Sequence, residues 1–178
     1  MPYATPAQVI AEFGLREVTQ LLADEQELLT EQLLLGAIAV AAGGAWTGSP
    51  SAAEIAAAQA ALARLLRKIE TVGNYMDGYL RSAITLPVSA LDANLGTLNE
   101  CCMALVRCGL ADDTDNATER MDECCNKHRA WLKDVARGVV SLVNAAGAEL
   151  PSGAKVRTGQ AASNYNWGGY PPGWGGGL

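Results

Sequence analysis

Residues 51–87 read SAAEIAAAQAALARLLRKIETVGNYMDGYLRSAITLP and carry the longest helical pattern in the chain. Its apolar residues recur three or four positions apart, the spacing that gathers side chains on one face of an α-helix; they are Ile55, Leu62, Leu65, Leu66, Ile69, Val72, Met76, Tyr79 and Leu80. Ser51 and Glu54 form a capping-box pattern at the start. Pro87 ends the pattern, because the residue before a proline is pushed out of the helical region. We therefore predict one helix from Ala52 to about Ile84, roughly 50 Å long at a rise of about 1.5 Å per residue.

Shorter helical patterns lie on both sides of this helix. Thr5 and Gln8 form a second capping box, Pro6 occupies the favoured first position, and Gly14 can end that helix. We expect further helices over residues 15–23, 27–42, 92–110 and 117–137. Asp112-Asp113-Thr114-Asp115 are expected to form a turn that caps the last of them.

The sequence changes character after the last of these helices. Residues 139–143 are the only strand-like run, and beyond Ala145 the chain is rich in Gly, Ser, Asn and Pro. The predicted fold is all-α: a small helical bundle with a long central helix, a short β-like segment after the last helix and an extended C-terminal arm. We assign residues 1–143 to the helical domain and residues 144–178 to the arm.

The composition limits the classes of function. Of 178 residues, 13 are Lys or Arg and 19 are Asp or Glu, which gives a formal net charge of −6. This balance argues against binding nucleic acid by neutralising phosphates, because that mode requires clustered basic residues. The most hydrophobic window, Leu33 to Trp46, has 14 uncharged residues, fewer than the roughly 20 that a bilayer span needs. We expect no membrane span, and the N-terminus has no secretory signal pattern.

Five cysteines occur, at positions 101, 102, 108, 124 and 125. An odd count without a secretory signal suggests reduced thiols in a cytoplasm. Cys124 and His128 share a helix face, and Cys101 and Cys108 share another, so a tetrahedral zinc site is conceivable. Adjacent cysteine pairs point about 100° apart on a helix, and no Cys-x-x-Cys spacing is present. We therefore favour cysteines that fill small core positions over a metal or catalytic site.

The arm has an unusual composition from Thr158 onward. It contains no charged side chain, and four large aromatic residues stand on a glycine-rich backbone: Tyr165, Trp167, Tyr170 and Trp174. One interpretation is a disordered tail. The other is a segment that becomes ordered on a partner, with the aromatic side chains as anchors.

Three motifs, taken in order, resemble the head–tail adaptor (neck or connector) proteins of Mu-like tailed bacteriophages. The motifs are Tyr3-Ala-Thr-x-x-Gln-Val-Ile-x-x-Phe13-Gly14, Asp77-Gly-Tyr79-Leu-Arg81-x-x-x-x-Leu-Pro87 and Leu132-x-x-Val-Ala-x-Gly138-Val-Val-x-Leu142. The resemblance covers residues 3–24 and 52–143. Residues 25–51 look like an Ala/Leu-rich insertion.

The resemblance implies a structural protein of the virion neck, assembled in the host cytoplasm. Such adaptors are helical bundles that form a homo-oligomeric ring, usually of twelve copies, between the portal protein and the stopper or tail-completion protein. Genome DNA passes through the ring without sequence-specific binding, and neither catalysis nor a cofactor is implied. The C-terminal segment docks onto the portal, so the four arm aromatics become the predicted portal-binding residues. The alternatives are a metal-binding Cys/His enzyme or sensor, and a monomeric helical interaction module.

The second motif has a plain geometric interpretation. Asp77 and Arg81 are four residues apart, so they can pair on one helix face and contribute about 0.2–0.5 kcal/mol if exposed. We therefore expect the motif to fix the exit from the long helix rather than to form a site.

Overall fold

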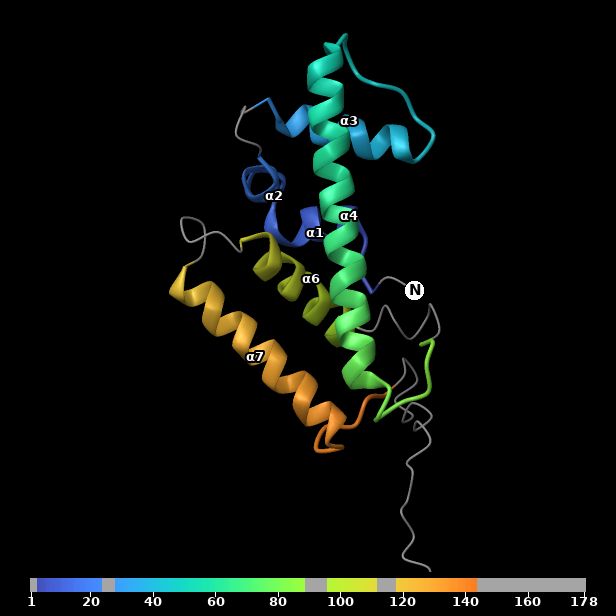
Figure 1. The fold of residues 1–178 in the computed structure, drawn as a ribbon, viewed down its shortest axis with the longest axis vertical. Helices are drawn as coiled ribbons and strands as arrows, with labels where there is room; N and C mark the ends of the chain where they lie inside the picture. The colour runs from blue at the N-terminus through green and yellow to red at the C-terminus, as the bar shows by residue number, and fades with distance from the viewer. Residues whose placement is uncertain (1–2, 24–27, 89–95, 112–117, 144–178) are drawn as a thin grey trace, which may run out of the picture.

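A computed structural model describes residues 3–23, 28–88, 96–111 and 118–143. Within these residues the chain forms six helices (Figure 1): α1 (Pro6–Phe13), α2 (Leu15–Leu22), α3 (Glu31–Ala41), α4 (Ala52–Leu80), α6 (Gly96–Leu110) and α7 (Glu119–Ala136). The described part contains no sheet, so the predicted all-α class is confirmed. No helix in this part is long and apolar enough to cross a membrane.

Both predicted capping boxes are formed. The Thr5 backbone N–H donates to Gln8 Oε1 over 2.9 Å, and the Gln8 N–H donates back to Thr5 Oγ1 over 3.3 Å. At the start of α4, the Ser51 N–H donates to Glu54 Oε2 over 2.7 Å, and the Glu54 N–H donates to Ser51 Oγ. The hydrogen bonds from Ser51 lower the pKa of the Glu54 carboxyl. Gly14 ends α1 with φ of 87°, a conformation that glycine adopts without steric cost.

The boundaries of three helices differ from the prediction. Helix α4 ends at Leu80 instead of near Ile84, and in the turn that follows the Ala83 and Ile84 N–H groups both donate to the Leu80 carbonyl. Helix α3 begins at Glu31, since the Thr30 hydroxyl caps it by accepting from the Leu33 N–H. Helix α7 is capped in the same way by Thr118. The aspartate turn expected to cap it, at 112–115, lies outside the described residues.

The predicted β-like segment is not a strand in the described chain. After Gly138, with φ of 75°, residues 139–142 run as a turn and an irregular segment that forms no strand. A strand needs a neighbour to form a ladder, and no second strand-like run exists in this sequence.

Two helices organise the bundle. Helix α4 contacts α2, α3, α6 and α7, so the long helix is central as predicted. Helix α6 is the most deeply buried element, because α1, α2, α4 and α7 all contact it (Figure 1). Its buried residues cover most of its circumference: Leu98, Cys101, Cys102, Met103, Ala104, Leu105, Val106 and Leu110. A helix that is apolar on nearly all sides is stable only inside such a shell.

The predicted insertion contributes one helix to the structure. Helix α3 buries Leu33, Leu34 and Ala37, and it crosses the N-terminal half of α4 (Figure 1). The Trp46 ring then packs on Gly36, where a Cβ atom would lie only 2.7 Å from the ring carbon Cε3. The small residue in α3 therefore makes room for the return of the chain toward α4.

Candidate functional site

Tyr3 joins the N-terminal motif to the motif at the end of α4. Its side chain is only 3% exposed, and its hydroxyl donates to the Asp77 carboxylate. The Asn99 amide of α6 donates to the Tyr3 carbonyl oxygen over 2.7 Å and to Gln8 Oε1 over 3.3 Å. These contacts tie the N-terminal segment, α4 and α6 together at one point.

The Tyr3 hydroxyl remains protonated in this environment. Burial raises the pKa of Tyr3 well above its ordinary value, and the hydrogen bond to Asp77 raises it further. The neutral hydroxyl is the form that donates to a carboxylate, so the contact is consistent with the direction of the pKa shift.

Asp77 does not form the predicted ion pair with Arg81. Among the described residues, the one ion pair joins Arg107 to Glu17. The Asp77 carboxylate accepts from Tyr3, whereas Arg81 is exposed and contributes its backbone N–H to the Asp77 carbonyl over 3.0 Å. A partner from the N-terminal segment thus replaces the expected partner on the same helix.

Arg107 forms a second junction, which no local pattern in the sequence indicates. Its Nε donates to Glu17 Oε1 over 2.5 Å, and its guanidinium lies 5.0 Å from the centroid of the Phe13 ring. One residue of α6 therefore holds α1 and α2. Both charged side chains are about one third exposed, so the ion pair contributes at most about 1 kcal/mol.

The remaining motif residues surround the ends of α4 and α7. Tyr79 is half-buried and meets the exposed Tyr75 edge to face, with ring centroids 5.1 Å apart and hydroxyls 3.2 Å apart. This hydrogen bond raises the pKa of Tyr75. Pro87 lies exposed beyond the helix exit, and Gly138 provides the turn after α7. These residues lie at the ends and turns of the helices, and their role as a structural motif stays a prediction.

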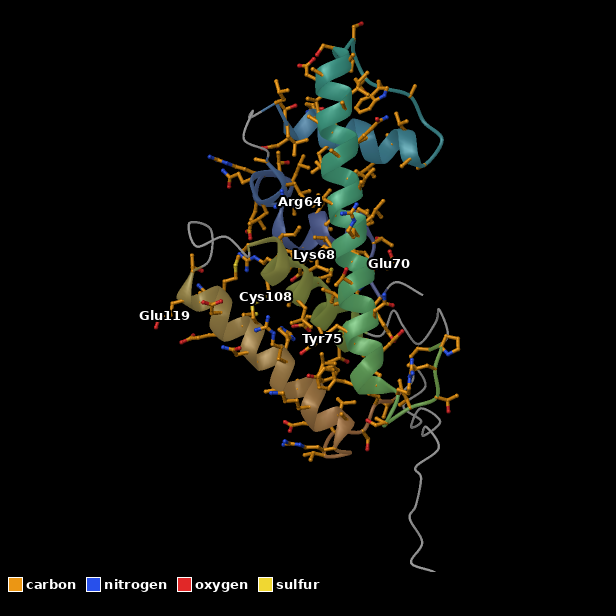
Figure 2. The ribbon with its side chains drawn as sticks, viewed as in Figure 1. Arg64, Lys68, Glu70, Tyr75, Cys108 and Glu119 are labelled. Carbon is orange, nitrogen blue, oxygen red and sulfur yellow. A yellow bond between two sulfur atoms is a disulfide. The ribbon has the colours of Figure 1, made fainter. Side chains whose placement is uncertain are left out.

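The expectation of five reduced thiols is wrong. Cys108 and Cys125 form a disulfide between α6 and α7, with their Cα atoms 6.1 Å apart (Figure 2 labels Cys108). The two helices are neighbours, and this proximity brings together two cysteines that lie 17 residues apart in the sequence. The spacing of the cysteines along the sequence does not indicate a tertiary contact of this kind.

Among the three free cysteines, the predicted core packing is confirmed for Cys101 and Cys102, whereas Cys124 is only half-buried. Cys101 and Cys102 are fully buried, and burial raises the pKa of each thiol to about 12. Burial also lowers the pKa of His128, against the opposing effect of Glu100. Within the described residues, no three His, Cys, Asp or Glu side chains converge on a possible metal position. The disulfide removes Cys108 from the set that the zinc alternative needs.

Among the hollows on the surface of the described chain, two adjoin motif residues. The larger, about 560 Å³, lies between the N-terminal segment and α4 and is lined by Ala4, Thr5, Pro6, Leu66, Ile69, Glu70, Gly73, Asn74 and Asp77. We call it the α4 groove. The smaller, about 130 Å³, is lined by Thr97, Leu98, Trp131 and residues 140–143. Among the residues that the structure describes, five large apolar side chains are exposed: Leu35, Leu66, Tyr75, Val139 and Val143. The described surface therefore offers apolar contact areas rather than a cluster of reactive groups.

The predicted portal-binding residues Tyr165, Trp167, Tyr170 and Trp174 all lie outside the described residues. No structural contact can be assigned to them, and their role remains a prediction.

Comparison with known proteins gives one match. No curated protein and no solved structure matches this chain. The family model described as bacteriophage Mu, Gp36 matches residues 3–160, a stretch that spans residues 25–51 and enters the arm. All three motifs lie within the matched residues. The chain therefore belongs to the bacteriophage Mu Gp36 family and is a structural or morphogenesis protein of a Mu-like phage.

Proposed function

We propose that this protein is a head–tail adaptor, which forms a ring between the portal protein and the stopper or tail-completion protein. The observation that carries the proposal is membership in the Gp36 family over residues 3–160. The role is architectural, without catalysis: the ring holds its neighbours in place and leaves a channel through which the genome passes.

The bundle has the mechanical features that such a part needs. One buried core includes residues from all six described helices. The Tyr3–Asp77 hydrogen bond, the Arg107–Glu17 ion pair and the Cys108–Cys125 disulfide each join different elements. A unit that is joined at several points keeps its shape when neighbouring subunits press on it. The exposed apolar side chains supply surface that neighbours can cover.

The acidic charge suits a DNA channel. Twelve copies at −6 each would give the ring a formal charge of −72. A negative channel wall would repel the DNA backbone and let the genome slide without adhering. The test is to place lysine at positions that line the channel, once these are located in the particle. Unchanged DNA ejection from such variants would refute the electrostatic part of the proposal.

The arm is the proposed attachment to the portal. The buried core of the described chain lies within residues 3–142, so a chain truncated after Leu150 retains all of these core residues. We expect this truncated chain to keep its helical circular dichroism but to lose binding in a pull-down with portal protein. Loss of the Trp167 or Trp174 side chain alone would cost at least about 2 kcal/mol of binding if each is a buried anchor. Normal recruitment of the truncated chain would refute the attachment role.

Imaging distinguishes the adaptor from the monomeric alternative. Negative-stain images of the purified chain, alone and mixed with portal protein, are expected to show rings. Particles that stay monomeric in both samples would favour a free-standing interaction module. Elemental analysis of the purified protein tests the metal-binding alternative, because stoichiometric zinc would support it.

A further inference from the structure

Three small residues contribute to the lining of the α4 groove. Ala4, Pro6 and Gly73 line it, and at Gly73 an added Cβ atom would lie 3.8 Å from the Tyr3 ring. The side chain of Leu66 stands at the groove and is 46% exposed. The groove thus combines a partly apolar lining with a large apolar side chain that the described chain leaves about half exposed.

The charges at the groove favour a neutral or basic occupant. The two ionisable groups that line the groove are the carboxylates of Glu70 and Asp77. The Asp77 carboxylate already accepts a hydrogen bond from the Tyr3 hydroxyl. Glu70 is exposed, and Figure 2 shows it on the side of α4 away from Tyr75. An acidic segment would therefore be repelled, whereas apolar, hydroxyl and indole groups would be accepted.

The C-terminal arm has the matching composition. Residues 158–178 contain no charged side chain, and they present two tyrosines and two tryptophans at positions 165, 167, 170 and 174. Lys155 and Arg157 come just before this segment, so the arm carries basic groups whose charge is opposite to that of Glu70. The aromatic side chains combine a large apolar surface with a polar tip, which suits an apolar hollow edged by carboxylates.

The arm also starts near the end of α4 that lies closer to the groove. The Ser82 hydroxyl donates to the Ala136 carbonyl over 3.1 Å, so the end of α7 lies beside the end of α4. Leu66 is 14 residues before Leu80, or about 21 Å along the helix axis. The 22 residues from Val143 to Tyr165 can span up to roughly 70 Å when extended. The tether is therefore long enough for the aromatic segment to reach the groove of the same chain.

We propose that the α4 groove holds the aromatic segment of the chain's own C-terminal arm, with its apolar side chains covering Leu66. A short tether raises the effective concentration of the arm at the groove to about the millimolar range, so a weak contact is sufficient to keep it there. This proposal goes beyond the adaptor role and applies to the free chain, whatever partner the arm later meets. In the proposed ring, the arm would have to leave the groove before it could engage the portal.

Hydrogen exchange on the full-length chain tests the proposal. Amides of residues 164–174 are expected to exchange at least about tenfold more slowly than the same segment as a free peptide. Leu66→Gln is expected to abolish this protection. Leu35→Gln is the matched control, because Leu35 is a similarly exposed leucine, at 41%, on α3 and outside the groove. Exchange at the free-peptide rate in the wild-type chain, or equal loss of protection in both variants, would overturn the proposal.

Photo-crosslinking identifies the occupant independently of any loss-of-contact variant. The full-length chain would carry benzoylphenylalanine in place of Leu66. A monomer-sized product that joins position 66 to the peptide with Trp167 or Trp174 is the expected result. A dimer-sized product through the same peptide would assign the groove to a second copy and overturn docking within one chain. A product without the arm peptide would also overturn it, and neither outcome would bear on the ring or on portal binding.

Discussion

The disulfide between α6 and α7 gives a stability prediction whose size follows from its place in the chain. Cys108 and Cys125 are 17 residues apart. In the chain-entropy treatment, closing a loop of this length in the unfolded chain stabilises the folded state by about 3 kcal/mol at 25 °C. We therefore expect Cys108→Ser to lower the free energy of unfolding by about 3 kcal/mol under oxidising conditions.

The assay is chemical unfolding by urea, followed by far-ultraviolet circular dichroism with and without reductant. Reductant should lower the stability of the wild-type chain to that of Cys108→Ser and should leave the variant unchanged. Cys124→Ser is the matched control, because Cys124 adjoins the bridge in the sequence yet carries a free thiol. This control should respond to reductant as the wild type does. A wild-type midpoint that reductant does not move, or a Cys124→Ser chain that loses the response, would refute the reasoning.

Two other contacts give further predictions. Tyr3→Phe removes the hydroxyl that donates to the Asp77 carboxylate, and thermal or urea unfolding should show a loss of about 2 kcal/mol at pH 7. The folded-state pKa of Tyr3 is raised. The wild type should therefore keep this stability below about pH 10 and lose it as the pH rises through the folded-state pKa. The Phe variant should lack this component of the pH dependence of stability. Gly36→Ala would place a Cβ atom 2.7 Å from the Trp46 ring, so it should cost about 1–3 kcal/mol and shift tryptophan fluorescence toward the red. Gly78→Ala, where nothing lies within 4 Å, should instead stabilise α4 by about 0.5–1 kcal/mol; equal effects at the two glycines would contradict the packing explanation.

The sequence by itself determined the helical class and several helix starts. Both capping boxes act across three residues, and the apolar stripe of α4 repeats every three or four. Such interactions are local, so the residues that make them can be read directly from the chain. The start of α3 was placed too early because the Ala/Leu-rich pattern extends past Thr30, whose hydroxyl forms the actual cap.

The candidate site could be predicted only as separate residues. Tyr3 and Asp77 were both named from the family resemblance, but their contact joins positions 74 residues apart. The junction of Arg107 with Glu17 spans 90 residues and was not anticipated at all. The predicted pairing of Asp77 with Arg81 was wrong because a partner from outside the helix reached the carboxylate.

The tertiary structure alone decided which surfaces and thiols meet. The cysteine pattern predicted buried thiols correctly for Cys101 and Cys102, yet the pairing of Cys108 with Cys125 depends on how α6 and α7 pack. The α4 groove likewise exists only because the N-terminal segment lies along α4. Local hydrogen bonding and side-chain periodicity determine each helix, whereas contacts between helices follow from the joint burial of all their apolar faces. No short stretch of the sequence specifies which helices contact one another.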